Sequence, residues 1–524
     1  MKILLVQPEF PVTFWSFKHA LDFVGKKVSN PPLGLLTVAA LLPDSWEKRL
    51  LDLNVEPLTD KDLAWADYLF ISAMDIQRKS VKEVLQQAKN NKLKIVAGGP
   101  LFTGEFDSYP EVDHFILNEG EITLLQFLSD LAAGHPKRLY RTDDYADIRQ
   151  SPIPIWNLLK FEAYDSMAVQ FSRGCPFNCD FCNVTALLGH KPRTKSASQL
   201  ITELDQLYQL GWRRNIFIVD DNFIGNKKQL KEEVLPALIE WRKGKTGCLF
   251  ITEASINLAD DDELIQLMVA AGFVSIFIGI ETPDDTSLTE CNKSQNRNRD
   301  MQQAIVKLQH AGMHIMAGFI VGFDSDTPSI FDRQIKFIQD SGIIVAMVGL
   351  LQAPFGTRLY ERLRDEGRLL SEMTGDNTDG STNIISKMDQ KALSQGYQKV
   401  IQAIYSPGLF YSRVKTFLRN YHPVKLPVHL EIQEIQAFFR SIWKLGIIGR
   451  ERKQYWNLFL WTLFTFPNRM PMAITMTIYG YHFRKIVETQ MSADALANSS
   501  RKVQVEPKSE PLKLAANKGI YQNK

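Results

Sequence analysis

The sequence predicts an α/β protein with two successive parallel sheets and a helical C-terminal domain. Strand and helix patterns alternate in residues 1–135, which predicts a doubly wound, Rossmann-like domain, and again in residues 166–384, which predicts a partial or full β/α barrel. Residues 385–490 have a helical pattern rich in aromatic residues. The length of 524 residues suits about three domains. A polar linker is predicted at 136–165, and a disordered tail at 491–524.

The first domain contains five predicted strands with helical patterns between them. The helices are expected at 33–42 and 80–89, and the strands at 3–6, 49–54, 68–73, 94–97 and 114–117. A doubly wound sheet binds ligands beyond the carboxyl ends of its strands, where Ser72, Gly98 and Gly99 are expected. Paired glycines let a backbone approach a ligand closely, but a plain tight turn explains them equally well.

The second βα series contains six predicted strands. They are expected at 168–171, 216–219, 249–253, 276–280, 316–321 and 346–351, with helices at 196–208, 228–242 and 299–311. In a barrel of this kind the active site lies at the carboxyl ends of the strands. Side chains at those ends are therefore the candidate site residues.

Charge and cysteine content exclude several classes of protein. The formal charge is 61 − 59 = +2, so the total does not predict a nucleic-acid partner. Five cysteines in 524 residues exclude a disulfide scaffold. The apolar run at residues 1–6 ends at Gln7-Pro8-Glu9 and is too short for a signal peptide, and no charge-free apolar run of spanning length precedes residue 450. These features predict a cytoplasmic protein.

The C-terminal region departs from this neutral balance. Residues 413–453 hold nine Lys and Arg against three Glu, a local charge of 9 − 3 = +6. Two apolar segments follow, at 456–466 and 470–481, each too short to span a bilayer. Two interpretations remain open: helices that pack on the barrel with solvated charges, or a peripheral contact with an anionic inner membrane.

Three of the five cysteines form a compact motif. Cys175, Cys179 and Cys182 follow a C-x3-C-x2-C spacing directly after a predicted strand. Three thiolates can hold three irons of a cubane cluster and leave the fourth open, whereas electron-transfer clusters use four cysteines. A zinc site completed by His190 is the alternative. Cys248 and Cys291 have no partner motif and are predicted to be buried packing residues.

The cysteine motif, with Phe181 before its last cysteine, closely resembles the signature of the radical S-adenosylmethionine (SAM) superfamily. Further stretches that resemble this family are residues 217–223, 277–282, 318–324 and 354–360. The resemblance implies that the three cysteines ligate a [4Fe-4S] cluster and that SAM binds its open iron. Reductive cleavage of SAM would then yield a 5′-deoxyadenosyl radical that abstracts hydrogen from an unactivated carbon. Such chemistry needs an electron donor such as ferredoxin or flavodoxin.

Carboxylates at the strand ends are candidates for the SAM pocket. By analogy with the family, Glu253 and Glu281 would contact the ammonium and ribose of SAM, and Asp220 and Asp221 would line the same pocket or bind substrate. The alternative for each is a carboxylate that caps a helix or pairs with an arginine.

The first domain, with residues 31–36 (PPLGLL) and 97–100 (AGGP), is similar to the cobalamin-binding radical SAM enzymes. The D-x-H-x-x-G motif that supplies a histidine to cobalt is absent, because the corresponding loop reads Met74-Asp75-Ile76-Gln77-Arg78. No histidine ligand is expected from this loop, and loss of cobalamin binding is the alternative. Cobalamin and an alkyl radical together imply methylation of an inert carbon, for which the protein aligns the cofactors and excludes water.

Residues 13–18 and 220–227 resemble the subgroup that includes the hopanoid C-2 methylases. This implies a small-molecule or lipid substrate, with a hopanoid as the leading hypothesis. Two rivals remain. One is a ring-forming or oxidative radical SAM enzyme that transfers no methyl group. The other is a zinc-stabilised binding protein without catalytic activity.

Overall fold

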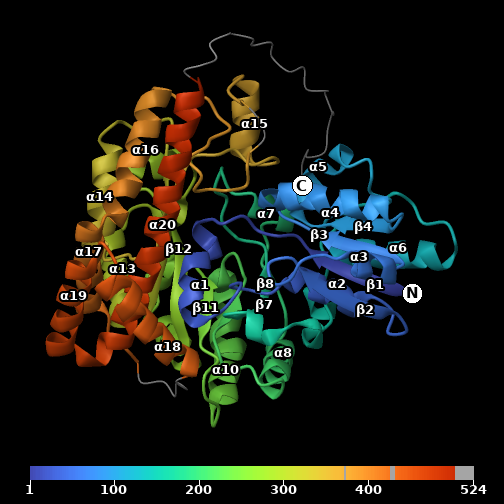
Figure 1. The fold of residues 1–524 in the computed structure, drawn as a ribbon, viewed down its shortest axis with the longest axis horizontal. Helices are drawn as coiled ribbons and strands as arrows, with labels where there is room; N and C mark the ends of the chain where they lie inside the picture. Colours follow the sequence, from blue (N-terminus) through green and yellow to red (C-terminus); the bar gives the residue numbers. More distant parts are fainter. Residues whose placement is uncertain (371–372, 425–430, 502–524) are drawn as a thin grey trace.

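The computed structural model describes residues 1–370, 373–424 and 431–501. Two six-stranded parallel sheets lie next to one another in the chain and in space, and helices from the C-terminal third cover the outer side of the second sheet (Figure 1). The predicted fold class is therefore confirmed: a Rossmann-like sheet is followed by a β/α sheet and a helical region.

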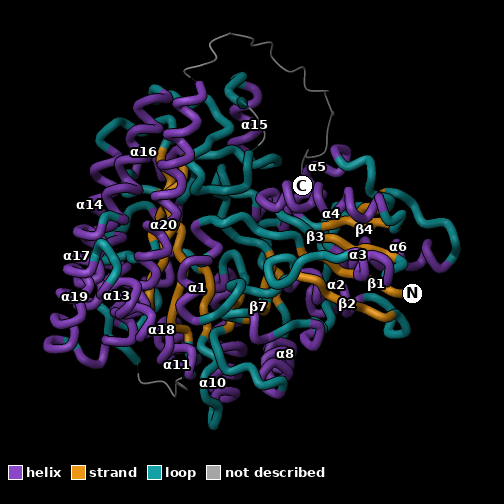
Figure 2. The backbone as a smooth tube through the Cα atoms, viewed as in Figure 1, coloured by secondary structure: helices purple, strands orange, loops and turns teal. Residues whose placement is uncertain are grey.

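The first sheet has the strand order β2-β1-β3-β4-β5-β6, and all its pairs are parallel. Its strands are β1 (Lys2–Gln7), β2 (Glu47–Asp52), β3 (Tyr68–Ser72), β4 (Lys94–Gly98), β5 (His114–Ile116) and β6 (Leu139–Tyr140). Helices α2 (Leu33–Leu41) and α6 (Gly120–Ala132) pack on one face, and α3 (Asp60–Trp65), α4 (Arg78–Asn90) and α5 (Pro100–Glu105) on the other. Figure 2 shows this sandwich of strands between helices. Strand β6 lies in the segment predicted as linker, because two residues are too short to show a periodic pattern.

The second sheet has the order β14-β13-β12-β11-β10-β7, again with all pairs parallel. Its strands are β7 (Met167–Val169), β10 (Ile216–Ile218), β11 (Phe250–Glu253), β12 (Phe273–Glu281), β13 (His314–Val321) and β14 (Ala346–Leu350). Among the described residues the edge strands β7 and β14 do not pair, so the barrel is partial. A short antiparallel ladder, β8 (Ser172–Arg173) with β9 (Arg193–Thr194), brackets the cysteine motif.

Helices cover the second sheet: α8 (Ala197–Gln209), α10 (Leu235–Arg242), α11 (Asp262–Ala271), α13 (Met301–His310) and α14 (Ile330–Ser341). The single helix predicted at 228–242 is divided into α9 (Lys227–Gln229), a π-helical segment at Leu230–Val234 and α10. Pro236 explains the division, because it lacks the N–H that a continuous α-helix would need there.

The C-terminal region is helical, as predicted. It contains α16 (Gln390–Tyr405), α17 (Pro407–Asn420), α18 (Ile432–Ser441), a π segment (Ile442–Ile447), α19 (Arg452–Thr465) and α20 (Met470–Arg501). Buried residues of α16 and α17 share one apolar core with the second sheet. Helix α20 continues to Arg501, so residues 491–501 are helical where a disordered tail was expected; alanines favour helix there. The rest of that predicted tail, 502–524, lies outside the described residues.

A search of the described helices finds none that combines the length and the apolar character needed to cross a bilayer.

Candidate active site

A cavity of about 840 Å³ lies where the carboxyl ends of the two sheets face one another. The first domain contributes Ser72, Gly98 and Gly99, and the second contributes Cys182, Asp221 and Glu281. Apolar side chains of the second sheet form another wall: Phe277, Phe319, Ile320, Met347 and Leu350. Candidate residues predicted separately in the two domains therefore share one cavity.

The three motif cysteines lie on the loop between β8 and α7 (Val184–Leu188), all partly buried and all free thiols. Burial raises the pKa of Cys182 to about 12. Hydrogen-bond donors surround the sulfurs: Asn222 Nδ2 lies 3.8 Å from the Sγ of Cys175, and Gln295 Nε2 lies 3.6 Å from that of Cys179. Donors of this kind stabilise thiolates, which are the form that binds iron. The loop therefore fits an iron–sulfur cluster.

Lys293 brings a positive charge to the cysteine loop. Its Nζ donates to Glu281 Oε1 at 2.6 Å and lies 5.7 Å from the centroid of the Phe181 ring. Although burial lowers the pKa of Lys293, Glu281 and Cys179 outweigh it and hold that pKa above its ordinary value. Gly279 leaves the space for this pair, because a Cβ there would lie 2.3 Å from Glu281 Oε1. The spacing of sequence motifs could not identify Lys293.

Glu281 ends β12 in an unusual backbone conformation. Its φ is 64°, in the left-handed region, and the register between β12 and β13 shifts between Gly279 and Glu281. Such strain in a non-glycine residue is often found where a side chain must be aimed into a site. The irregular strand end turns the Glu281 carboxylate toward the cavity, where it meets Lys293.

The two neighbouring aspartates after β10 have different positions. Asp220 is fully buried and accepts hydrogen bonds from the backbone N of Phe171 (2.8 Å) and the Oγ of Ser172 (2.6 Å), so it fastens the strand that leads to the cysteines. Asp221 lines the cavity, whereas Asp220 does not.

Glu253 ends β11 close to this pair and, like Asp220, is not among the residues that line the cavity. Burial, reinforced by the charges of Asp221 and Asp220, raises the pKa of Glu253 to about 8. No hydrogen-bond donor to its carboxylate is found among the residues that the structure describes. Acidic groups gathered without a cation fit a ligand that carries positive charge, as SAM does at its ammonium and sulfonium groups.

The first-domain wall of the cavity has the small residues that a flat ligand needs. Gly99 has a φ of 92°, and a Cβ there would lie 2.7 Å from Ser72 Oγ. Gly34 of α2 faces open space, and a Cβ on Gly120 of α6 would lie 4.0 Å from Val38 Cγ2. Asn118 Oδ1 is buried without a hydrogen-bond partner in the described structure, so it is available to a ligand donor. These features fit cobalamin.

Met74, Asp75 and Ile76, in the loop that follows β3, line the cavity. No histidine is among the described residues that line it. Gly375, from the segment after α15 (Arg358–Asp365), packs against this loop, since a Cβ on it would lie 2.6 Å from the backbone N of Ile76.

Four charged side chains join the two domains beside the cavity. Arg173, just before the cysteines, makes a two-pronged contact with Glu121 at 2.7 and 3.1 Å. Arg193 of β9 pairs with Glu119 at 2.8 and 2.5 Å. All four are largely buried. We call this set the Glu–Arg clamp; it connects the start of α6 directly to the cysteine loop.

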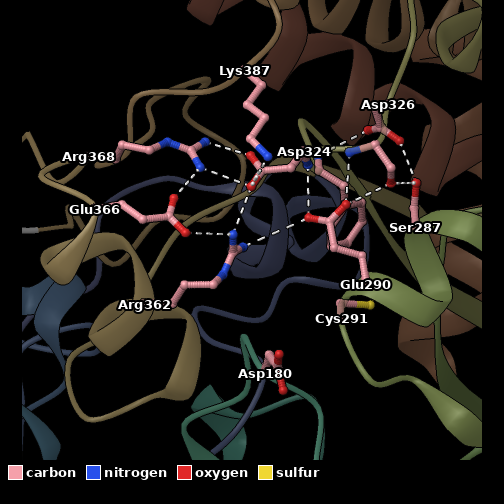
Figure 3. Close-up of polar contacts among 12 residues, drawn as sticks. Asp180, Ser287, Glu290, Cys291, Asp324, Asp326, Arg362, Glu366, Arg368 and Lys387 are labelled. Atoms are coloured by element: carbon pink, nitrogen blue, oxygen red, sulfur yellow. Dashed lines mark hydrogen bonds and ion pairs between the residues drawn. The ribbon is translucent and has the colours of Figure 1, made fainter.

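A second ionic network lies outside the cavity, at the end of β13. Figure 3 shows Asp324 among Arg362, Arg368 and Lys387, with Glu290 and Asp326 beside it. Although burial raises the pKa of Asp324, the two guanidinium groups hold it far below its usual range. None of these residues lines the cavity, so the network fastens α15 and the following loop to the second sheet.

The other cysteines and His190 lie away from the cavity lining. Cys248 and Cys291 are buried in apolar clusters, as predicted. His190, the fourth ligand of the alternative zinc site, has an exposed side chain. No group of three or more His, Cys, Asp or Glu is placed around the position of a single metal ion, as zinc would need, in the described part of the chain.

Three family models match this chain. The B12-binding domain matches residues 27–128, the radical SAM superfamily matches 169–338, and a domain of unknown function, DUF4070, matches 357–495. Two curated relatives match over most of their length. An uncharacterized methyltransferase of Synechocystis is 39% identical over 96% of both chains. The hopanoid C-2 methylase of Rhodopseudomonas palustris is 33% identical over 88% of this chain and 89% of its own.

Solved structures have the same architecture. The cobalamin-dependent SAM radical enzyme OxsB, with aqua-cobalamin and SAM bound, superposes with a TM-score of 0.59 at 14% identity and covers 97% of this chain and 82% of its own. The radical SAM methyltransferase TsrM from Kitasatospora setae, with cobalamin and a [4Fe-4S] cluster, gives 0.57 at 14% identity and covers 87% of this chain and 98% of its own. At 14% sequence identity, these comparisons show that the fold is shared.

Proposed function

This chain belongs to the cobalamin-dependent radical SAM methylases, and we propose that it methylates an unactivated carbon of an apolar lipid, with a hopanoid as the leading candidate. Its cofactors are a [4Fe-4S] cluster, SAM and cobalamin. When bound, the cluster and SAM supply a hydrogen-abstracting radical, and cobalamin supplies the methyl group. The observation that carries the proposal is the single cavity that both domains line.

We assign the cluster to Cys175, Cys179 and Cys182. The amide donors of Asn222 and Gln295 stabilise the negative charge on two of the sulfurs, and Lys293 adds a cation nearby. Together these groups favour thiolates in a partly buried loop, which burial alone would disfavour.

We assign the binding of SAM to Asp221, Glu253 and Glu281. Asp221 lines the cavity and Glu253 lies close behind it, so the two carboxylates make this wall acidic, which suits the positively charged part of SAM. Glu281, oriented by Lys293, presents its carboxylate at the same cavity and suits a ribose hydroxyl. Asp220 is then a positioning residue, because its oxygens hold Phe171 and Ser172.

We assign cobalamin to the space between α2, α6 and the carboxyl end of the first sheet. Ser72, Gly98 and Gly99 bound this space, and Asn118 offers an acceptor to the ligand. Because the Met74–Ile76 loop carries no imidazole, we propose that no side chain of that loop binds cobalt.

The substrate proposal rests on the apolar wall. Phe277, Phe319 and Met347 face the cavity, and Trp15 packs edge-on to Phe277 at 5.3 Å while its Nε1 lies 3.2 Å from the Met347 sulfur. Aromatic and thioether groups suit an apolar ring system and exclude water from the reacting carbon.

The test is anaerobic reconstitution with cluster, cobalamin, SAM, a strong reductant and a hopanoid. We expect a methylated hopanoid together with both S-adenosylhomocysteine and 5′-deoxyadenosine. In Cys179→Ala we expect loss of the cluster absorption and of both SAM products, whereas Cys248→Ala, at a buried cysteine remote from the motif, should retain them. 5′-Deoxyadenosine without S-adenosylhomocysteine would instead favour ring-forming or oxidative chemistry, and other methylated lipids would redirect the substrate assignment.

Two further elements of the proposal concern partners. The reaction requires single electrons at low potential, which a ferredoxin or flavodoxin supplies. A lipid substrate resides in a membrane, so we propose that the C-terminal helical region makes a peripheral contact with it, consistent with its basic charge.

A further inference from the structure

The helices α18 and α19 present a large apolar surface to solvent. Phe464 is 82% exposed, Ile432 is 72% exposed and Phe439 is 63% exposed. We call the surface the α18–α19 face; it is formed by Ile432, Ile435, Phe439, Trp443, Ile447, Ile448, Trp456, Leu460, Leu463 and Phe464. Single exposed apolar residues are ordinary, but ten of them on two successive helices mark an interaction surface.

The spacing of these residues shows that they line up. Residues 432, 435, 439, 443 and 447 follow intervals of three or four along α18 and the π segment, and 456, 460, 463 and 464 do so along α19. Each helix uses its opposite side for packing, where Ala437, Tyr455 and Leu458 are buried. The exposed stripes are therefore a second apolar side of each helix, which does not take part in core packing.

The charges around the face are positive. Residues 431–469 hold six Lys and Arg against three Glu. The glutamates are engaged internally: Glu431 pairs with Arg214 at 2.7 Å, Glu434 accepts from the Glu431 backbone N, and Glu451 pairs with Arg484.

The basic side chains divide into two groups. Arg440, Lys444 and Arg469 are engaged with the fold. Arg450, Arg452 and Lys453 are exposed in and beside the turn between the two helices. The face thus combines apolar stripes with free positive charge.

We propose that the α18–α19 face docks on an anionic lipid bilayer, with its apolar stripes in the interfacial layer and Arg450, Arg452 and Lys453 against lipid phosphates. Such an arrangement is typical of helices that lie in the plane of a membrane surface. A second copy of the chain suits the face less well, because a two-fold contact would bring the same positive turn residues toward one another. The inference deepens the proposed function, since it identifies the surface for the peripheral contact.

The docking face is connected to the cavity by the N-terminal segment. Arg440 of α18 donates to the backbone O of Phe23 at 2.8 Å, within α1 (Lys18–Val24). The residues just before α1 include Trp15, which contacts Phe277 and Met347 of the cavity wall. A short segment, residues 15–23, therefore links α18 to the apolar wall of the cavity.

The test is sedimentation of the full-length holoenzyme with vesicles of phosphatidylcholine alone or mixed equally with phosphatidylglycerol. Leu460→Asp and Leu125→Asp are a matched pair, because the two leucines are 48% and 51% exposed and lie on α19 and α6. We expect binding to the anionic vesicles, weakened about tenfold by Leu460→Asp and unchanged by Leu125→Asp. Reversal of Arg450, Arg452 and Lys453 to Glu should remove the preference for anionic lipid.

Three results would overturn the docking face: no binding of wild type to anionic vesicles, equal effects of the two leucine variants, or a dimer that Leu460→Asp dissociates. Methylation of a detergent-dispersed hopanoid separates this inference from the proposed function. If the docking face is wrong, wild type still methylates the detergent-dispersed hopanoid. If the substrate is wrong, wild type does not methylate it, whether or not the protein binds vesicles.

Discussion

Gly99 has a positive φ at the junction of β4 and α5, and it also lines the cavity. Its sequence context left a tight turn and a ligand approach equally open. In the structure the positive φ of Gly99 belongs to the strand–helix junction. Ser72 lies on one side of the residue and the cavity on the other. A side chain at position 99 would have to displace Ser72 or the Ala73 backbone, which lie within 3.0 Å of the added Cβ.

We therefore predict that Gly99→Ala weakens cobalamin binding at least about tenfold while the iron content stays unchanged. Gly134→Ala is the matched control, because Gly134 also has a positive φ, 82°, but nothing lies within 4 Å of its added Cβ. Gly134→Ala should lose roughly 1–2 kcal/mol of unfolding free energy through backbone strain, and Gly99→Ala should lose more, because its added Cβ also meets Ser72 and Ala73. Equal cobalamin affinity in the two variants, measured by equilibrium titration, would contradict the assignment.

His314, at the start of β13, makes the stability of the protein dependent on pH. Burial lowers its pKa from 6.5 to about 4. Because its pKa is lower in the native protein, His314 takes up a proton more readily in the unfolded chain. Its contribution to the unfolding free energy is therefore complete above pH 6.5 and is lost as the pH falls toward 4. We predict that the difference in unfolding free energy between wild type and His314→Gln falls by about 2 kcal/mol from about pH 7 to about pH 5. A difference independent of pH in urea titrations would refute this.

At the scale of elements, the Glu–Arg clamp fixes the start of α6 against the β8–β9 ladder. The clamp therefore holds the B12-binding domain against the ladder that brackets the cysteine loop. Breaking a buried ion pair leaves an uncompensated charge, so a neutral substitution on one side both destabilises and loosens this junction.

We predict that Glu121→Gln lowers the unfolding free energy by about 3 kcal/mol or more and reduces S-adenosylhomocysteine formed per 5′-deoxyadenosine. Glu105→Gln is the control, because the Arg78–Glu105 pair is a similar two-pronged contact within the first domain alone. Glu105→Gln should lower the unfolding free energy without changing the ratio of S-adenosylhomocysteine to 5′-deoxyadenosine. An unchanged ratio in Glu121→Gln would show that the clamp serves stability only.

The elements also show what sequence patterns can predict. Strands of three or more residues are predictable, most of them because burial on both faces leaves continuous apolar runs, whereas the two-residue strands are not. The cysteine loop is predictable because three thiols lie close together in the chain. The clamp and Lys293 were not found. Arg193 and Glu119 are 74 residues apart, and Lys293 meets the cysteine loop from more than a hundred residues away. Contacts of this kind arise only from the tertiary fold and leave no local periodicity.

At the scale of the whole molecule, the second sheet and the C-terminal helices form one unit, whereas the first domain has cores of its own. Phe417 of α17 is fully buried and packs edge-on to His314 of β13 at 5.5 Å. Phe115 is buried in the first domain among Phe102 and Phe106. This division means that damage to a C-terminal helix reaches the catalytic sheet, while damage to the first domain need not.

We predict that Phe417→Ala lowers the unfolding free energy by about 3–5 kcal/mol and reduces the hydrogen-exchange protection of the β13 amides to the same extent, because loss of the ring leaves a cavity in the shared core. Phe115→Ala, an equally drastic truncation, should reduce protection in the first sheet and leave β13 unchanged. If the C-terminal helices lost protection in Phe417→Ala while β13 kept it, they would be an independent appendage. Helices α18 and α19 could then move without disturbing the second sheet, whereas the shared core packs these helices and the cavity wall into one unit.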